Sequence, residues 1–94
     1  MQAIEYELKQ PIQYGSELIE RVTLKPLTPL MMDEAPADPT TWKLKDVHRL
    51  ILEITGWERP VLSKISGEDY RGIQEHLSGF LRKFLATGEI DSDS

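Results

Sequence analysis

The sequence predicts an α+β fold in which an N-terminal β-hairpin packs against two or three α-helices. Apolar and polar residues alternate in residues 3–9 and again in residues 17–25, which is the period of half-buried strands. From about residue 41 onward, apolar residues instead recur every three or four positions, as on one face of a helix. The 94 residues suffice for one domain. Because two strands alone are not stable in water, we expect the helices to cover the hairpin.

The two predicted strands alternate with different regularity. Their inner faces are expected to hold Ile4, Tyr6 and Leu8 in the first strand and Leu18, Val22 and Leu24 in the second. Glu20 interrupts the second apolar face, so we expect the start of that strand to lie at an edge. Between the strands, Pro11 and Gly15 punctuate the stretch QPIQYGS. This stretch predicts a loop that is longer than a two-residue turn.

After the hairpin, the sequence predicts a short helix over residues 28–34. Thr28 can accept a hydrogen bond from a backbone amide, and Pro29 suits the first helical turn. Pro36 and Pro39 cannot continue a helix, so residues 35–40 are expected to form a loop.

Two longer helices are predicted, over residues 41–55 and 67–87. The apolar stripe of the first holds Trp42, Val47, Leu50, Ile51 and Ile54, and is widened by Leu44 and Leu52. Gly56 follows where a left-handed closing residue is usual. Ser66 is expected to cap the second helix, with Asp69 reaching back in a capping box. The apolar residues of the connection WERPVLSKI are expected to pack down.

The final helix has an apolar stripe that extends beyond the core that so small a chain can form. The stripe comprises Tyr70, Ile73, Leu77, Phe80 and Phe84, with Leu81 and Leu85 to one side. We expect Ile73 and Leu77 to lie at the centre of the core. Two interpretations of the rest are open: a rim of the core, or a face for a partner or a second copy. The candidate partner-binding residues are Phe80, Leu81, Phe84 and Leu85, with Phe80 shared between core and interface.

Composition argues against several function classes. Sixteen acidic and eleven basic residues give a formal net charge of -5, which disfavours nucleic acid and anionic membranes as partners. Cysteine is absent, so disulfides and thiolate metal sites are excluded. His48 and His76 are the only histidines and lack metal-ligand spacing. We expect no polar pocket near either, no catalytic residues, no metal and no cofactor. The first residues do not resemble a signal peptide, and we expect a soluble domain over residues 1–87 with a disordered acidic tail over 88–94.

The order of these elements resembles the small tail assembly chaperones of contractile-tailed, Mu-like phages and prophages. The resemblance lies in YELKQPIQYGSELIERVTLKPLTPLMMDE and in ITGWERPVLSKISGEDYRGIQEHLSGFL, and covers most of residues 4–81. The matching features are the strand at Val22 to Leu24, Pro26, the helix end at Thr55–Gly56, the connection from Leu62 to Ile65, and the helix start from Ser66 to Tyr70. The stretch APADPTT departs from the family pattern, in which a helix usually continues after the second strand.

This resemblance implies a binding function and no catalytic residues. Members of the family bind the tape measure protein and help to recruit tail tube subunits around it in the host bacterial cytoplasm. They are absent from the mature virion. The alternative is a small structural or adaptor protein, such as a minor tail component, that forms a homo-oligomer through its last helix.

Overall fold

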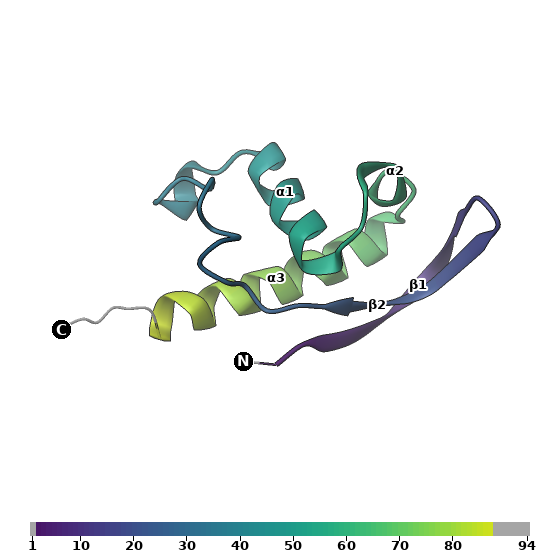
Figure 1. Cartoon of the computed structure of the whole chain (residues 1–94), viewed down its shortest axis with the longest axis horizontal. Helices are drawn as coiled ribbons and strands as arrows, with labels where there is room; N and C mark the ends of the chain where they lie inside the picture. The colour runs from purple at the N-terminus through teal and green to yellow at the C-terminus, as the bar shows by residue number, and fades with distance from the viewer. Residues whose placement is uncertain (1, 88–94) are drawn as a thin grey trace.

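An antiparallel hairpin followed by three α-helices forms the fold in this computed structural model, which describes residues 2–87. The elements are β1 (Ile4–Tyr14), β2 (Glu17–Leu24), the 3₁₀ turn η1 (Pro39–Thr41), α1 (Leu44–Thr55), α2 (Arg59–Leu62) and α3 (Gly67–Thr87). The helices lie on one side of the hairpin, and α3 runs along it (Figure 1). The predicted α+β class is therefore confirmed. The predicted tail over 88–94 lies outside the described residues.

The hairpin is longer than predicted and its turn is shorter. β1 continues through Pro11 to Tyr14, and only Gly15 and Ser16 connect it to β2. The prediction of a longer loop was therefore wrong. Gly15 has a φ of 63° and Ser16 does not have a positive φ, which is the pattern of a type II′ turn with glycine at its first central position.

A large bulge in β1 changes the register of the hairpin part-way along. Glu7 pairs with Arg21, but the next pair is Ile12 with Ile19, so residues 8–11 of β1 stand opposite Glu20 alone. This shift by an odd number of residues reverses which face β2 presents beyond the bulge. Leu18 consequently points outward and is 52% exposed, contrary to its predicted inner position.

The main core forms where β2, α1 and α3 meet. Its buried members are Val22, Leu24, Leu27, Leu50, Ile51, Ile54, Ile73, Leu77 and Phe80. A smaller cluster of Leu8, Ile12 and Val61 lies under α2. Ile73 is fully buried and Leu77 is 4% exposed, which confirms their predicted central place. The Lys25 amide donates to the Ile54 carbonyl over 2.9 Å and so joins the end of β2 to the last turn of α1.

Residues 28–34 form successive turns and not the predicted helix. The amides of Met32 and Asp33 donate to the carbonyls of Pro29 and Leu30, three residues back, at 3.1 and 3.2 Å. Thr28 does accept a hydrogen bond, from the Met31 amide at 3.3 Å. The segment thus begins as a helix would, but bonds of the i to i−3 type replace the α-helical pattern before the prolines end it.

The helices α1 and α3 differ in how well their predicted bounds agree with the structure. α1 begins at Leu44, three residues later than predicted, because η1 occupies Pro39–Thr41. Leu44 is 67% exposed and does not widen the buried stripe. At the other end Gly56 adopts the predicted left-handed conformation, with a φ of 73°. α3 begins at Gly67 as predicted and is helical to Thr87, the last described residue, and the Asp69 amide donates to the capping Ser66 hydroxyl at 3.1 Å.

Candidate functional site

The four predicted partner-binding residues differ widely in exposure. Phe80 is 3% exposed and belongs to the main core, so the structure does not make it a surface residue. Leu81 and Phe84 are half-buried and pack against that core. Leu85 is 44% exposed. The final turns of α3 therefore present one exposed leucine and the outer edges of two half-buried apolar side chains.

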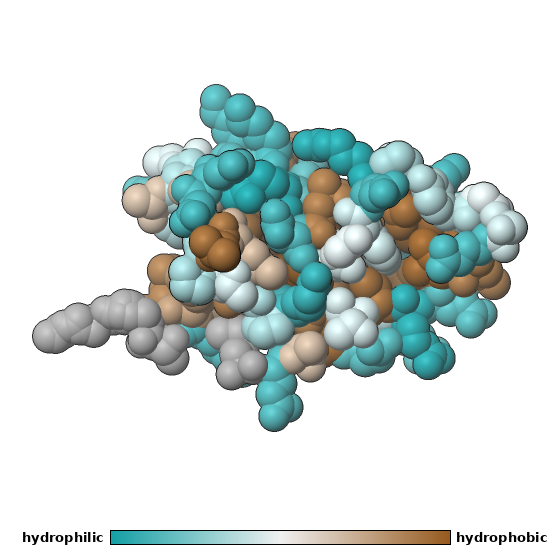
Figure 2. All heavy atoms as spheres, in the orientation of Figure 1, coloured by the Kyte–Doolittle hydropathy of each residue, from teal (hydrophilic) through white to brown (hydrophobic). Residues whose placement is uncertain are grey.

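The segment between β2 and α1 adds apolar surface at the same end of the molecule. Leu30 is 80% exposed, and the half-buried Met31 and Met32 pack against the main core. This segment and the last turns of α3 occupy the same end of the long axis (Figure 1). Apolar side chains reach the surface there among hydrophilic ones (Figure 2). We call this surface the apolar end; it comprises Leu30, Met31, Met32, Leu81, Phe84 and Leu85.

Leu30, which the sequence did not mark as a surface residue, lies in the turns that replace the predicted helix over residues 28–34. The Arg49 guanidinium holds the segment by donating to the Met31 carbonyl over 3.2 Å. The adjacent Met–Met pair was the available signal, since flexible apolar side chains are common at adaptable binding surfaces.

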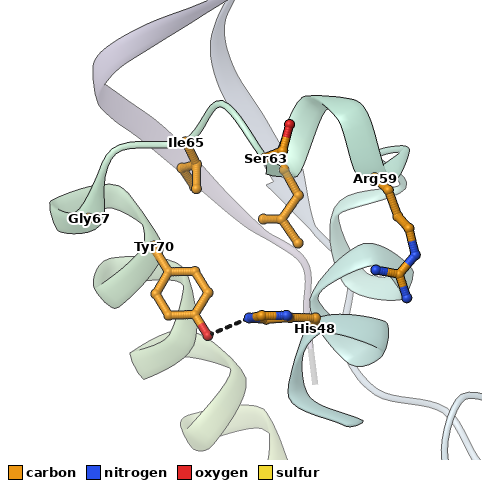
Figure 3. Close-up of a pocket in the computed structure, with 7 residues that line it drawn as sticks. His48, Arg59, Ser63, Ile65, Gly67 and Tyr70 are labelled. Carbon is orange, nitrogen blue, oxygen red and sulfur yellow. Dashed lines mark hydrogen bonds between the residues drawn. The ribbon is translucent and has the colours of Figure 1, made fainter. Parts of the chain in front are cut away.

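A pocket of about 470 Å³ lies between α1, α2 and the start of α3. Its lining comprises His48, Arg59, Leu62, Ser63, Ile65, Gly67 and Tyr70 and is more apolar than polar (Figure 3). His48 Nε2 and the Tyr70 hydroxyl are 3.0 Å apart and hydrogen-bonded. We expected no polar pocket near either histidine. The structure places a mixed pocket beside His48, where residues of α1, α2 and the start of α3 meet, and a second hollow with charged residues in its lining beside His76.

A buried carboxylate joins the start of α3 to the bulge in β1. Asp69 is fully buried, and its two oxygens accept hydrogen bonds from four donors. The donors are the amides of Lys9 and Gln10 at 2.9 and 3.0 Å and the hydroxyls of Tyr6 and Ser66 at 3.1 Å. Backbone amides in a bulge have no hydrogen-bond partner in the strand ladder. Here the Asp69 carboxylate accepts from these two amides instead. One half of the predicted capping box therefore forms, because the Asp69 amide donates to the Ser66 hydroxyl, while the Asp69 carboxylate accepts from that hydroxyl and from β1.

These hydrogen bonds determine the ionisation of both acidic groups. Burial by itself raises the pKa of Asp69, but the hydrogen bonds from the two amides, Ser66 and Tyr6 outweigh it and lower the pKa below its ordinary value. Burial, followed by the hydrogen bond to Asp69, raises the pKa of the Tyr6 hydroxyl. Asp69 is therefore an ionised structural residue that faces donors on every side, and not a free catalytic carboxylate.

Comparison with protein-family models, curated proteins and solved structures gave no match. Within residues 2–87, no three histidine or acidic side chains come together in a way that could hold a metal ion. No helix in this part of the chain has both the length and the apolar character needed to cross a membrane. The functional candidates in the described residues are thus two surfaces, the apolar end and the pocket beside His48.

Proposed function

We propose that this chain is a non-enzymatic tail assembly chaperone that binds the tape measure protein of a contractile-tailed phage or prophage. The resemblance of the two long stretches of residues 4–81 supports the family assignment. The observation that carries the binding function is the apolar end, where Leu30 is 80% and Leu85 is 44% exposed. Exposed apolar surface of this kind suits a helical client with an apolar face.

In the proposed function the apolar end covers the client before tail tube subunits surround it. No covalent step is needed, because burial of apolar surface supplies the binding free energy. The net charge of -5 keeps the complex soluble while its apolar surface is occupied. Of the candidate residues, Leu85 is expected to make the larger contact, since Phe80 is already buried in the core.

Co-expression with the tape measure protein tests this function. Leu85→Asp should weaken client binding by about 1–3 kcal/mol and reduce soluble client, because a charge replaces an anchor at the interface. Leu18→Asp is the matched control, since Leu18 is 52% exposed but lies on the hairpin. Equal client solubility with both variants would exclude the end of α3 as the client site.

A second outcome decides between the two candidate functions. If the wild-type chain does not keep the tape measure protein soluble, the chaperone function is wrong. If the chain then self-associates in size-exclusion chromatography and Leu85→Asp makes it monomeric, the adaptor that oligomerises through its last helix is the correct function.

A further inference from the structure

The pocket beside His48 combines an apolar wall with one unpaired positive charge. Leu62, Ile65 and the ring of Tyr70 supply apolar surface, and the Arg59 side chain extends from α2 toward His48 (Figure 3). Within residues 2–87, the Arg59 guanidinium makes no hydrogen bond or ion pair. The Ser63 hydroxyl is already engaged, because it donates to the Pro60 carbonyl over 2.7 Å. Arg59 is therefore the charged group available to a ligand.

The absence of acidic residues from this lining is unusual for so acidic a chain. Three other hollows on the described surface each include at least one glutamate beside their basic residues. The first hollow holds Glu17 and Glu58 with Arg21. The second holds Glu68 and Glu75 with Lys9 and Arg71, and the third holds Glu75 with Arg82 and Lys83. In each of those hollows at least one glutamate lies near the basic groups and offsets part of their charge. In the His48 pocket the positive charge of Arg59 is not balanced by the lining.

We propose that this pocket binds a peptide segment in which a bulky apolar side chain is followed by an aspartate or glutamate. The apolar side chain would occupy the space beside Leu62 and Ile65, and the carboxylate would pair with Arg59, whose guanidinium matches carboxylate geometry. The volume of about 470 Å³ falls in the range of pockets that hold such groups.

A peptide fits this pocket better than a small free anion. The pocket is partly open to solvent, so an extended chain can lie across it while one side chain enters. A free phosphate would meet one guanidinium only and would leave the apolar wall without a partner. This site is separate from the apolar end and does not depend on the proposed chaperone function.

Titration of the full chain with short blocked peptides tests the proposal without any client. The probes are acetyl-Ala-Phe-Asp-Ala-amide, acetyl-Ala-Leu-Asp-Ala-amide and the corresponding Asn peptides, followed by amide shifts in NMR spectra. The Asp peptides should shift the amides of Leu62, Ile65, Gly67 and Tyr70. The Asn peptides should bind about fivefold more weakly, since they lack the charge.

Two arginine variants show whether Arg59 is responsible. Arg59→Gln should remove the preference for Asp over Asn peptides, and because Arg59 is exposed its thermal midpoint should match that of the wild type. Arg71→Gln is the matched control, because Arg71 lies in a different hollow beside Glu68 and Glu75. That variant should keep the preference.

Three results would overturn the proposal. The first is an absence of shifts at the pocket with any of the peptides. The second is equal affinity of the wild-type chain for Asp and Asn peptides, which requires no variant to observe. The third is binding of 4-phenylbutyrate in the pocket without binding of any peptide, which would assign the site to small carboxylic acids.

Discussion

At the scale of single residues, Asp69 connects the two halves of the fold. Its carboxylate lies at the start of α3 and accepts from the amides of Lys9 and Gln10, which the bulge removes from the strand ladder. A buried carboxylate is costly unless donors surround it. Here four donors do so, and the bulge and the helix start therefore depend on each other.

Replacing Asp69 by asparagine should lower the free energy of unfolding by about 2–4 kcal/mol. Asparagine keeps the size of the side chain, but its NH₂ group would replace one of the two carboxylate oxygens. The donors that now bond to that oxygen would then face another donor. Denaturant unfolding measures the change. Glu68→Gln is the control in the same helical turn, and because Glu68 is exposed it should change stability by less than about 0.5 kcal/mol.

The pH dependence of stability tests whether the Asp69 carboxylate causes the difference between wild type and Asp69→Asn. The pKa of Asp69 is lower in the folded chain than its ordinary value, so its contribution to stability is complete above about pH 4. This contribution is lost as the pH falls through the folded pKa. The difference between wild type and Asp69→Asn should therefore shrink in acid. A difference that stays constant down to pH 2 would contradict this explanation.

At the scale of elements, α3 contains two interior glycines with different surroundings. A Cβ at Gly72 would overlap the Tyr6 hydroxyl and lie 2.8 Å from the Tyr6 Cζ atom. A Cβ at Gly79 would have no neighbour within 4 Å. Gly72 thus permits the close approach of β1 to α3, where the Tyr6 and His76 rings pack edge to face at 5.8 Å. Gly79 is not required for packing.

The two alanine substitutions should therefore have opposite signs. Gly79→Ala should raise the free energy of unfolding by about 0.5–1 kcal/mol, because alanine is the better helix former. Gly72→Ala should lower it by about 1–2 kcal/mol despite the same helix preference, because Tyr6 must move away from Asp69. Thermal unfolding of both variants provides the measurement. Equal stabilisation by both would show that Tyr6 is not held against α3.

At the scale of the whole molecule, the stability of the hairpin depends on the helices. β1 and β2 form a two-stranded sheet, and such a sheet is marginal in water without further packing. The main core is shared by β2, α1 and α3, so loss of packing on α3 affects the hairpin as well. We therefore expect the hairpin and the helices to unfold together in one cooperative transition.

Truncation of Leu77 tests this shared core. Leu77→Ala should lower the free energy of unfolding by about 2–5 kcal/mol, since Leu77 is 4% exposed and its loss leaves a cavity. Strand and helix signals should still disappear together. Ser78→Ala, at the exposed neighbouring position, should have little effect. A loss below about 1 kcal/mol for Leu77→Ala would place this residue outside the stabilising core.

Local chemistry allowed much of the fold to be predicted from the sequence. The hairpin followed by helices comes from a change of apolar period, and the start of α3 follows from the Ser66 cap. Gly56 closes α1 because the left-handed conformation there favours glycine. Each of these signals lies within a few residues of the element that it specifies, so no knowledge of distant contacts was needed.

The tertiary structure alone decided the features that depend on contacts between distant residues. The alternation of residue types predicted an inner position for Leu18, but the bulge in β1 reverses the face that β2 presents. The amides of that bulge donate to Asp69, which lies some sixty residues away in sequence. The His48 pocket forms where residues of α1, α2 and α3, distant from one another in sequence, come together. Leu30 is 80% exposed in the turns that replace the predicted helix. Strand register and surface exposure depend on what packs across from a residue, and neighbours along the chain do not reveal that.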